Sequence, residues 1–206
     1  MLKEFWDKRY SEPHYVYGEE PNQFFKETID NLPEGRILLP ADGEGRNSVY
    51  AASQGWQVDA FDVSSEARNK ALFLAQISGV DLSYQVLEFK DAFTNYAPNS
   101  FDVIALIYLH VPLQLKMQYY RLLITLLKPG GHLVFEGFSK HHRKNQEDNP
   151  MVGGPQKIDL LYSKEEMSLF FDELHFIQLS EEDIVLTEGV GHNGKGSVVR
   201  FIGQKR

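Results

Sequence analysis

The chain of 206 residues contains no cysteine. Disulfide bonds, thiolate metal sites and a cysteine nucleophile are therefore excluded. The chain also lacks any unbroken apolar run of about 18 residues, which a membrane-spanning helix would need. Its first seven residues, Met1–Asp7, carry charges where a secretory signal would be apolar. These absences predict a cytoplasmic protein with no membrane partner.

Positive charge is scarce, because 21 Lys and Arg residues face 29 Asp and Glu residues and leave a net charge of −8. A nucleic-acid partner requires a basic face that displaces phosphate counterions. The densest basic run, residues 140–144, is followed by Glu147 and Asp148, which favours a solvated loop. The seven histidines show no His-x-x-x-His spacing. We therefore expect neither a nucleic-acid partner nor a metal site.

Length and an apolar content of 42% predict one domain with a single core. Residues 1–32 are predicted to form a helical lid of two short helices around an aromatic loop, and residues 36–206 the core. Strands are expected at residues 37–41, 58–62, 82–87, 101–107 and 132–138, and helices at 46–54, 64–78, 113–127 and 163–172. Residues 139–162 are predicted to be a long loop, and a loop of that length usually has a function.

The alternation of strands and helices predicts an α/β fold with a doubly wound, mostly parallel sheet. The end of the chain differs, because residues 176–186 and 197–203 are both strand-like and a Gly-rich turn at 189–196 joins them. A C-terminal antiparallel hairpin would complete a seven-stranded, Rossmann-like sheet with one reversed strand. A dehydrogenase would continue with a second βαβ half instead.

Residues 36–62 are the most informative segment: a strand, a glycine turn, a helix, and a second strand that ends at Asp62. This layout binds a nucleoside, because glycines let the backbone approach the ligand and the acid accepts the ribose hydroxyls. The third glycine of the dinucleotide pattern is replaced by Ser48. A nucleoside cofactor other than a dinucleotide is therefore favoured.

Two acids, Asp42 and Glu44, flank Gly43 in this turn. They would repel a pyrophosphate but tolerate an ammonium or a sulfonium group. S-adenosylmethionine carries both groups together with an adenosine. The segment therefore predicts S-adenosylmethionine as the cofactor, with S-adenosylhomocysteine as its product.

The chain resembles the class I S-adenosylmethionine-dependent methyltransferases, and within them the tellurite-resistance and thiopurine methyltransferase-like group. The segments that carry the resemblance span almost the whole chain: 5–10, 17–22, 43–48, 127–131, 153–155 and 188–194. The wider class often has an acid two residues before the first glycine of the turn. Here Leu39 stands at that place and Ala41 replaces the glycine. The methionine end of the cofactor would then be held differently, by Asp42.

Ligands of open α/β sheets bind beyond the carboxyl ends of the strands. We therefore expect cofactor-binding residues in the lid and at the strand ends: Trp6, Tyr17, Ala41, Asp42, Gly43, Gly45, Arg46, Asn47, Asp62, Val63, Asp91, Ala92, Phe93, Ile107 and Tyr108. The resemblance implies that Asp91 accepts from the adenine amine, and the alternative is that it caps a helix. Aromatic rings in the lid would attract a sulfonium cation. Residues 136–139 are expected to face the substrate.

Two histidines, His110 and His192, fall in loops at the predicted cofactor end. Either could act as the base for an oxygen or nitrogen acceptor, or simply order its loop. The predicted function is methyl transfer from S-adenosylmethionine to a small molecule, such as a thiol or a metalloid, by a monomer or weak homodimer. Two alternatives are a non-catalytic S-adenosylmethionine-binding module and a nucleotide-dependent oxidoreductase.

Overall fold

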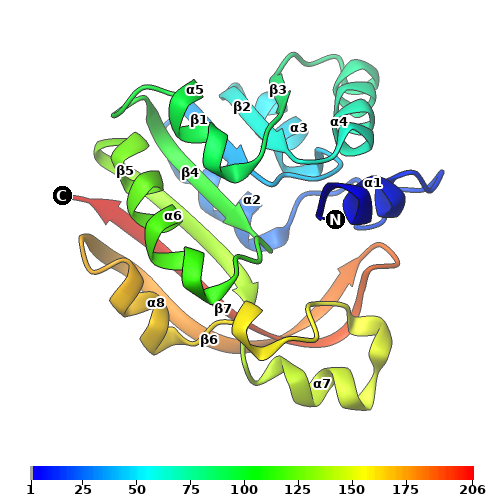
Figure 1. Cartoon of the computed structure of the whole chain (residues 1–206). Coiled ribbons are helices and arrows are strands. Elements are labelled where there is room, and N and C mark those ends of the chain that lie inside the picture. The colour runs from blue at the N-terminus through cyan, green and yellow to red at the C-terminus, as the bar shows by residue number, and fades with distance from the viewer. Residues whose placement is uncertain (1) are drawn as a thin grey trace.

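The computed structural model describes residues 2–206, without the side chains of Leu2 and Phe93. Within this range, seven strands form one sheet in the order β3-β2-β1-β4-β5-β7-β6 (Figure 1). The strands are β1 (Arg36–Pro40), β2 (Gln57–Asp62), β3 (Ser83–Val86), β4 (Phe101–Ile107), β5 (Leu127–Phe138), β6 (Leu174–Glu188) and β7 (His192–Lys205). The predicted α/β class and the mostly parallel seven-stranded sheet are confirmed.

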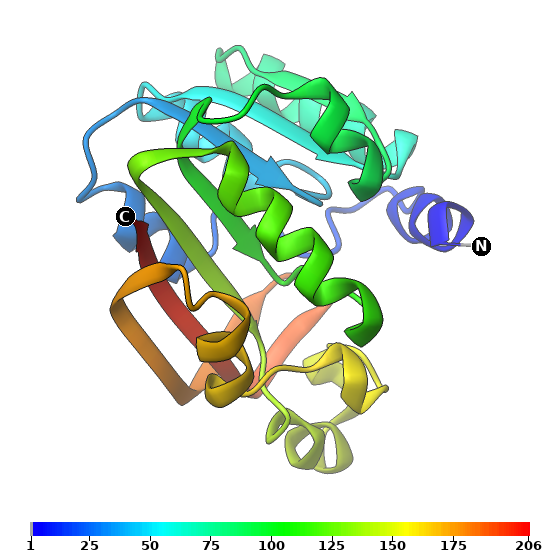
Figure 2. The same ribbon diagram turned by 60° about the vertical axis from the view of Figure 1, so that its left-hand side comes forward.

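Helices cover both faces of this sheet, as Figures 1 and 2 show. The helices are α1 (Leu2–Tyr10), α2 (Gln23–Ile29), α3 (Arg46–Ser53), α4 (Ser65–Ser78), α5 (Ala92–Asn95), α6 (Leu113–Leu126), α7 (His142–Asp148) and α8 (Lys164–Phe170). Helices α2, α3 and α4 pack on one face, and α5, α6 and α8 pack on the other. All helices of the described range are too short or too polar to cross a lipid bilayer.

The central strands β1 and β4 are apolar because helices cover both of their faces. Leu38 in β1 and Ile104 in β4 are fully buried and pair in parallel register. From β1 the chain crosses to β2 on one side, whereas β4 lies on the other side. The carboxyl ends of β1 and β4 therefore stand at the switch point of the sheet, where such folds bind ligands.

The C-terminal hairpin is present, and β7 runs antiparallel to both β5 and β6. The predicted Gly-rich turn at 189–196 was too long, because β7 already begins at His192. Gly196 belongs to the strand ladder, and a Cβ there would lie 2.8 Å from Cδ1 of Leu186. The glycine therefore makes room for a neighbouring side chain rather than for a turn.

Two further predictions of segment boundaries were wrong. The loop expected at 139–162 contains α7 and two 3-10 turns, Pro150–Val152 and Ile158–Leu160. Strand β5 begins at Leu127 and not at His132, because Leu127 pairs with Phe101 before a bulge shifts the register. The predicted helices at 64–78 and 163–172 are present as α4, which Ser64 caps, and α8, which Ser163 and Glu166 cap in a capping box.

Helices α3 and α4 approach each other at Gly45, the N-cap of α3, which has a left-handed φ of 91°. A Cβ at this position would lie 2.5 Å from Cβ of Ala71 in α4. Gly79, the C-cap of α4, also has a left-handed φ, of 69°, but a Cβ there would meet nothing within 4 Å. Both glycines thus adopt a left-handed backbone conformation, but only Gly45 is in close contact with a neighbouring helix.

We expect Gly45→Ala to destabilise the protein more than Gly79→Ala. Both substitutions place alanine in a left-handed conformation, which costs about 1–2 kcal/mol. Only Gly45→Ala adds overpacking between two helices, which typically costs a further 1–3 kcal/mol or so. Urea unfolding of the two variants measures the difference, and equal losses of stability would contradict the packing role of Gly45.

Candidate functional site

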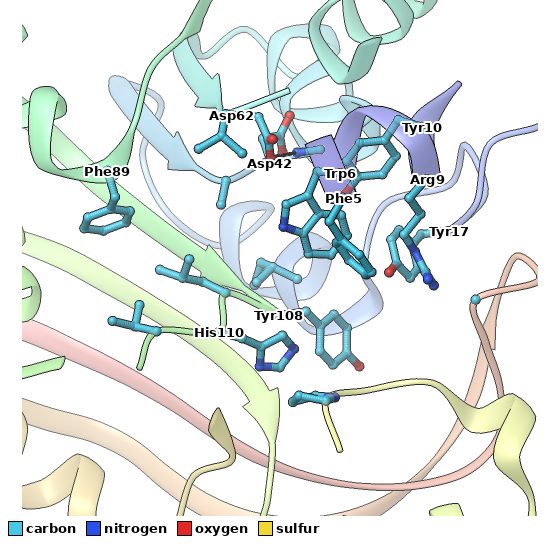
Figure 3. Close-up of a pocket in the computed structure, with 18 of the residues that line it drawn as sticks. Phe5, Trp6, Arg9, Tyr10, Tyr17, Asp42, Asp62, Phe89, Tyr108 and His110 are labelled. Carbon is cyan, nitrogen blue, oxygen red and sulfur yellow. Dashed lines mark hydrogen bonds between the residues drawn. The ribbon is translucent and has the colours of Figure 1, made fainter. Parts of the chain in front are cut away.

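A cavity of about 1220 Å³ opens at the carboxyl ends of the parallel strands (Figure 3). Its wall comes from α1, the glycine turn after β1, the ends of β2, β3 and β4, residues 150–160 and the β6–β7 turn. Pockets for drug-sized ligands span about 300–1,000 Å³. This cavity can therefore hold a nucleoside cofactor and a second small molecule together.

Most of the predicted site residues meet at this cavity. Those that line it are Trp6, Tyr17, Ala41, Asp42, Gly43, Arg46, Asn47, Asp62, Val63, Asp91, Ile107, Tyr108, His110 and His192. Gly45 instead packs α3 on α4, and Ala92 is fully buried in the hydrophobic core. The side chain of Phe93 lies outside the described residues.

Asp42 is the least satisfied polar group of the cavity wall. Both of its carboxylate oxygens are buried, and neither makes a hydrogen bond of good geometry with the described residues, although Ser48 lies close by. Burial raises the pKa of Asp42 to about 7. Burying a carboxylate without partners is costly. The group is therefore poised to pair with a cation on a ligand.

Its neighbour Glu44 differs, because Glu44 already has partners. It accepts hydrogen bonds from the backbone N–H of Val16 (2.8 Å) and from Nζ of Lys70 (2.7 Å). Glu44 thus fastens the lid segment and α4 to the glycine turn. Of the two acids that flank Gly43, only Asp42 remains available for an ammonium group.

Asp62 ends β2 beside the glycine turn. Its Oδ2 accepts from the N–H of Gly43 (3.1 Å) and its Oδ1 from the N–H of Ser64 (2.9 Å). Burial raises the pKa of Asp62 to about 6. Each carboxylate oxygen keeps a second lone pair that can accept a ribose hydroxyl. Figure 3 shows Asp42 and Asp62 close together at one end of the cavity.

The N-terminal segment covers this end. Trp6 stacks on Tyr10 with ring centroids 5.3 Å apart, and Arg9 lies over the ring of Tyr17 at 5.4 Å. Asp7 attaches α1 to the N-terminus of α4 by accepting from Oγ of Ser64 (2.7 Å). Hydrogen bonds from the Lys3 ammonium, and then from Ser64, lower the pKa of Asp7 to about 2.

The ends of β1 and β4 carry unusual backbone. Ala41 has a φ of 54° and Tyr108 a φ of 53°, both in the left-handed region that non-glycine residues rarely adopt. The N–H of Tyr108 donates to the carbonyl of Glu136 at 2.7 Å. Such strain gathers at functional sites, where the surrounding structure enforces it. Here the strained residues Ala41 and Tyr108 follow β1 and β4, the two strands on either side of the switch point.

The two candidate histidines have different surroundings. Nδ1 of His110 lies 3.4 Å from the carbonyl oxygen of Leu160, and burial lowers the pKa of His110 to about 3. His192 begins β7 rather than lying in a loop, and its Nδ1 lies 2.9 Å from Oε2 of Glu188. Only His192 therefore has a carboxylate as its partner.

Sequence reasoning missed part of the wall and misplaced one acid. Phe89 and Tyr119 line the cavity and stack at 4.7 Å, beyond the end of β3. Phe89 stands two residues before the predicted site residue Asp91. An aromatic residue so close to a predicted ligand contact could have indicated that Phe89 also lines the site. Glu136, expected to face the substrate, is fully buried instead and accepts from Arg200 and from Nδ2 of Asn22 (2.7 Å).

Comparison with known proteins gives a family for the segment that contains this turn. Residues 37–131 match the family model of a methyltransferase domain. This segment, which contains the glycine turn, is therefore similar to a methyltransferase domain. This match favours a methyltransferase over a nucleotide-dependent oxidoreductase. A search of curated protein sequences gives no match.

Solved structures share the fold at low sequence identity. A protein studied for the conversion of a disulfide bond into a thioacetal group during echinomycin biosynthesis is 16% identical with a TM-score of 0.79, covering 100% of this chain and 92% of its own. TehB from Haemophilus influenzae is 15% identical with a TM-score of 0.71, covering 99% and 67%. A methyltransferase from Methanosarcina mazei is 19% identical with a TM-score of 0.64, covering 87% and 96%.

The residues of the cavity fit S-adenosylmethionine. The unpaired carboxylate of Asp42 suits the cofactor's ammonium group, and Asp62 retains acceptor capacity for the ribose hydroxyls. Trp6 and Tyr108 present aromatic rings to the cavity, and such rings attract a sulfonium. These assignments of single residues remain predictions.

We expect cofactor affinity to rise with pH because Asp42 must be ionised to hold an ammonium group. Its raised pKa means that the free protein keeps a proton near neutral pH that a cationic ligand must displace. Calorimetry with S-adenosylhomocysteine should show about five- to tenfold tighter binding at about pH 7.5 than at about pH 6. The higher pH of this comparison, about 7.5, lies below the pKa of an α-amino group, about 7.7–8.0, so that the ammonium group of the ligand stays largely protonated.

The Asp42→Asn variant is the control for this measurement. It should bind more weakly at every pH and show a smaller pH dependence, since Asp62 is then the acid that still titrates in this range. An unchanged dissociation constant in Asp42→Asn, with an unchanged circular dichroism spectrum, would place the ammonium group elsewhere.

The lid interpretation predicts protection by the cofactor. Trypsin can cleave after Lys8 and Arg9 in α1, and S-adenosylhomocysteine should slow this cleavage severalfold because the ligand holds α1 closed. The rate is followed by mass spectrometry of the released peptide. A nicotinamide dinucleotide serves as the control ligand and should give no protection; equal rates with and without S-adenosylhomocysteine would make α1 a passive packing element.

Proposed function

We propose that the chain methylates a small molecule, and that its acceptor is a sulfur, selenium or tellurium nucleophile such as a thiol or a metalloid. The observation that carries this proposal is the division of the cavity into two ends. Asp42 and Asp62 lie close together at the cofactor end, whereas Tyr108 and His110 line the cavity away from them (Figure 3). A cavity wall made of aromatic side chains suits a small, soft acceptor.

Bound S-adenosylmethionine supplies a methyl carbon that its sulfonium already activates. The residues of the chain then have to align donor and acceptor and keep water away. Good alignment contributes roughly 7–11 kcal/mol in intramolecular reactions. We propose that Asp42 holds the ammonium group and Asp62 the ribose of the cofactor, and that Trp6 and Tyr108 enclose its reacting part.

The similar protein from the echinomycin study acts in sulfur chemistry, by the description of its structure. This likeness supports a sulfur acceptor as an analogy between folds. The net charge of −8 argues against a nucleic-acid acceptor, because an acidic surface releases no counterions from phosphates. We further propose that the protein acts as a monomer or weak homodimer in the cytoplasm.

Isotope-labelled S-adenosylmethionine tests the acceptor class directly. The purified protein is incubated with 2-mercaptoethanol, thiophenol, selenite, tellurite, catechol and a primary amine, and products are identified by mass spectrometry. We expect transfer to at least one thiol or metalloid. Labelling of RNA or of lysate proteins, with no transfer to any member of this panel, would contradict the proposal.

A further inference from the structure

We infer that His192 is the general base that takes a proton from the methyl acceptor, and that Glu188 positions its ring. The acceptor would then enter the cavity protonated, as a thiol or selenol, rather than as an oxyanion. This inference rests on the proposed function and narrows its acceptor class.

The proton positions on His192 follow from its partner. Nδ1 lies 2.9 Å from Oε2 of Glu188. An ionised carboxylate can only accept, so Nδ1 must carry the hydrogen and Nε2 must carry the lone pair. Nε2 makes no hydrogen bond to any described residue. His192 lines the cavity, so this lone pair is left for a ligand.

Glu188 is held in its ionised form by the groups around it. Arg46 donates to the same Oε2 at 3.1 Å, and Nδ2 of Asn22 donates to Oε1 at 2.9 Å. Burial alone would raise the pKa of Glu188, but the hydrogen bond from His192 and the charge of Arg46 outweigh it and lower the pKa to about 2. Three donors from three different segments thus hold one carboxylate in place.

The ring of His192 is neutral before reaction. Burial lowers the pKa of His192, and the cations Arg46 and Arg9 lower it further, whereas the hydrogen bond and charge of Glu188 oppose them. A neutral imidazole can take up a proton, and the adjacent carboxylate then stabilises the imidazolium that forms. His110 has no such carboxylate, because the carbonyl of Leu160 faces its Nδ1.

The position of His192 also suits the reaction. Its ring centroid lies 4.5 Å from that of Tyr17, in the lid segment, and 4.5 Å from that of Tyr108, at the end of β4. Strand β4 lies beside β1, and the turn after β1 carries Asp42, so we place the methionine arm of the cofactor along the end of β4. The free nitrogen therefore stands where an acceptor would approach the methyl group, and not at the adenosine end.

The proposed step balances without a further reactant. The acceptor's S–H bond breaks and its proton moves to Nε2 of His192, while the sulfur electron pair forms the new S–CH₃ bond. The old bond between the methyl carbon and the sulfonium breaks, and its electron pair stays on that sulfur. A cationic donor and a neutral thiol thus become two neutral thioethers and one proton, which His192 passes to solvent.

Thiols of different acidity test this inference. 2-Mercaptoethanol is largely protonated at pH 7, as is expected for an alkanethiol with a pKa near that of cysteine, about 8.5. 4-Nitrothiophenol is already ionised at this pH. We expect His192→Gln to lower kcat/KM for 2-mercaptoethanol at least about tenfold, the lower range for loss of a general base, and to leave the value for 4-nitrothiophenol within about threefold.

The rate of the His192→Gln variant with 2-mercaptoethanol should recover as pH rises, because the thiol then ionises in solution. Glu188→Gln should move the acidic limb of the kcat/KM profile to lower pH, since the imidazolium loses its carboxylate. His175→Gln, a change of an exposed histidine in β6, is the matched control and should behave like the wild type.

Calorimetry with S-adenosylhomocysteine shows whether each variant keeps a formed cofactor site, and we expect His192→Gln to bind it as the wild type does. Equal losses with both thiols, or no loss with either, would overturn the role of His192, and so would lost cofactor binding. If the wild type methylates neither of these thiols nor any thiol or metalloid of the panel above, the proposed function on which this inference rests is contradicted instead, whereas methylation of a metalloid oxyanion alone would overturn this inference.

Discussion

The side chain of Asn22 makes the contacts on which much of this site depends. Its Nδ2 donates to Glu136 in β5 (2.7 Å) and to Glu188 in β6 (2.9 Å), and its backbone N–H donates to Oδ1 of Asn47 in α3 (2.9 Å). Its Oδ1 caps α2 through the N–H of Phe25. One buried amide thus fixes the lid segment relative to the glycine turn and the hairpin. Because Glu136 is fully buried and Glu188 is partly buried, losing this donor would leave two acids less well paired.

The parts of the fold that the sequence predicted best are those that local rules determine. Strand β4 was predicted at both of its ends, since residues 101–107 form an almost unbroken apolar run between turn residues. The helix predicted at residues 64–78 matches α4, because Ser64 and Gly79, residue types that favour helix ends, cap it. The cavity residues of the glycine turn followed in the same way, because the ends of parallel strands must meet at one edge of the sheet.

The parts that the sequence could not predict depend on partners far along the chain. Helix α7 begins without a side-chain cap, and its contacts come from elsewhere, such as the hydrogen bond from Asn145 to Oγ of Ser197 (2.8 Å). Residues 192–196 have little intrinsic preference for a strand, and the pairing of β7 with β6 imposes it. The orientation of Glu136 also depends on distant residues, because its carboxylate accepts hydrogen bonds from Asn22 and Arg200.

The left-handed backbone at Ala41 and Tyr108 sets a limit on engineering this protein. Each such residue holds roughly 1–3 kcal/mol of strain, which glycine would release. Selection for heat resistance alone would therefore favour glycine at Ala41, whereas glycine at Tyr108 would lose the packing of its ring on Phe138 and His192. The same change would loosen the strand ends that shape the cavity, so variants selected for melting temperature should lose turnover first. Directed evolution of this chain would need to select for catalysis at every round.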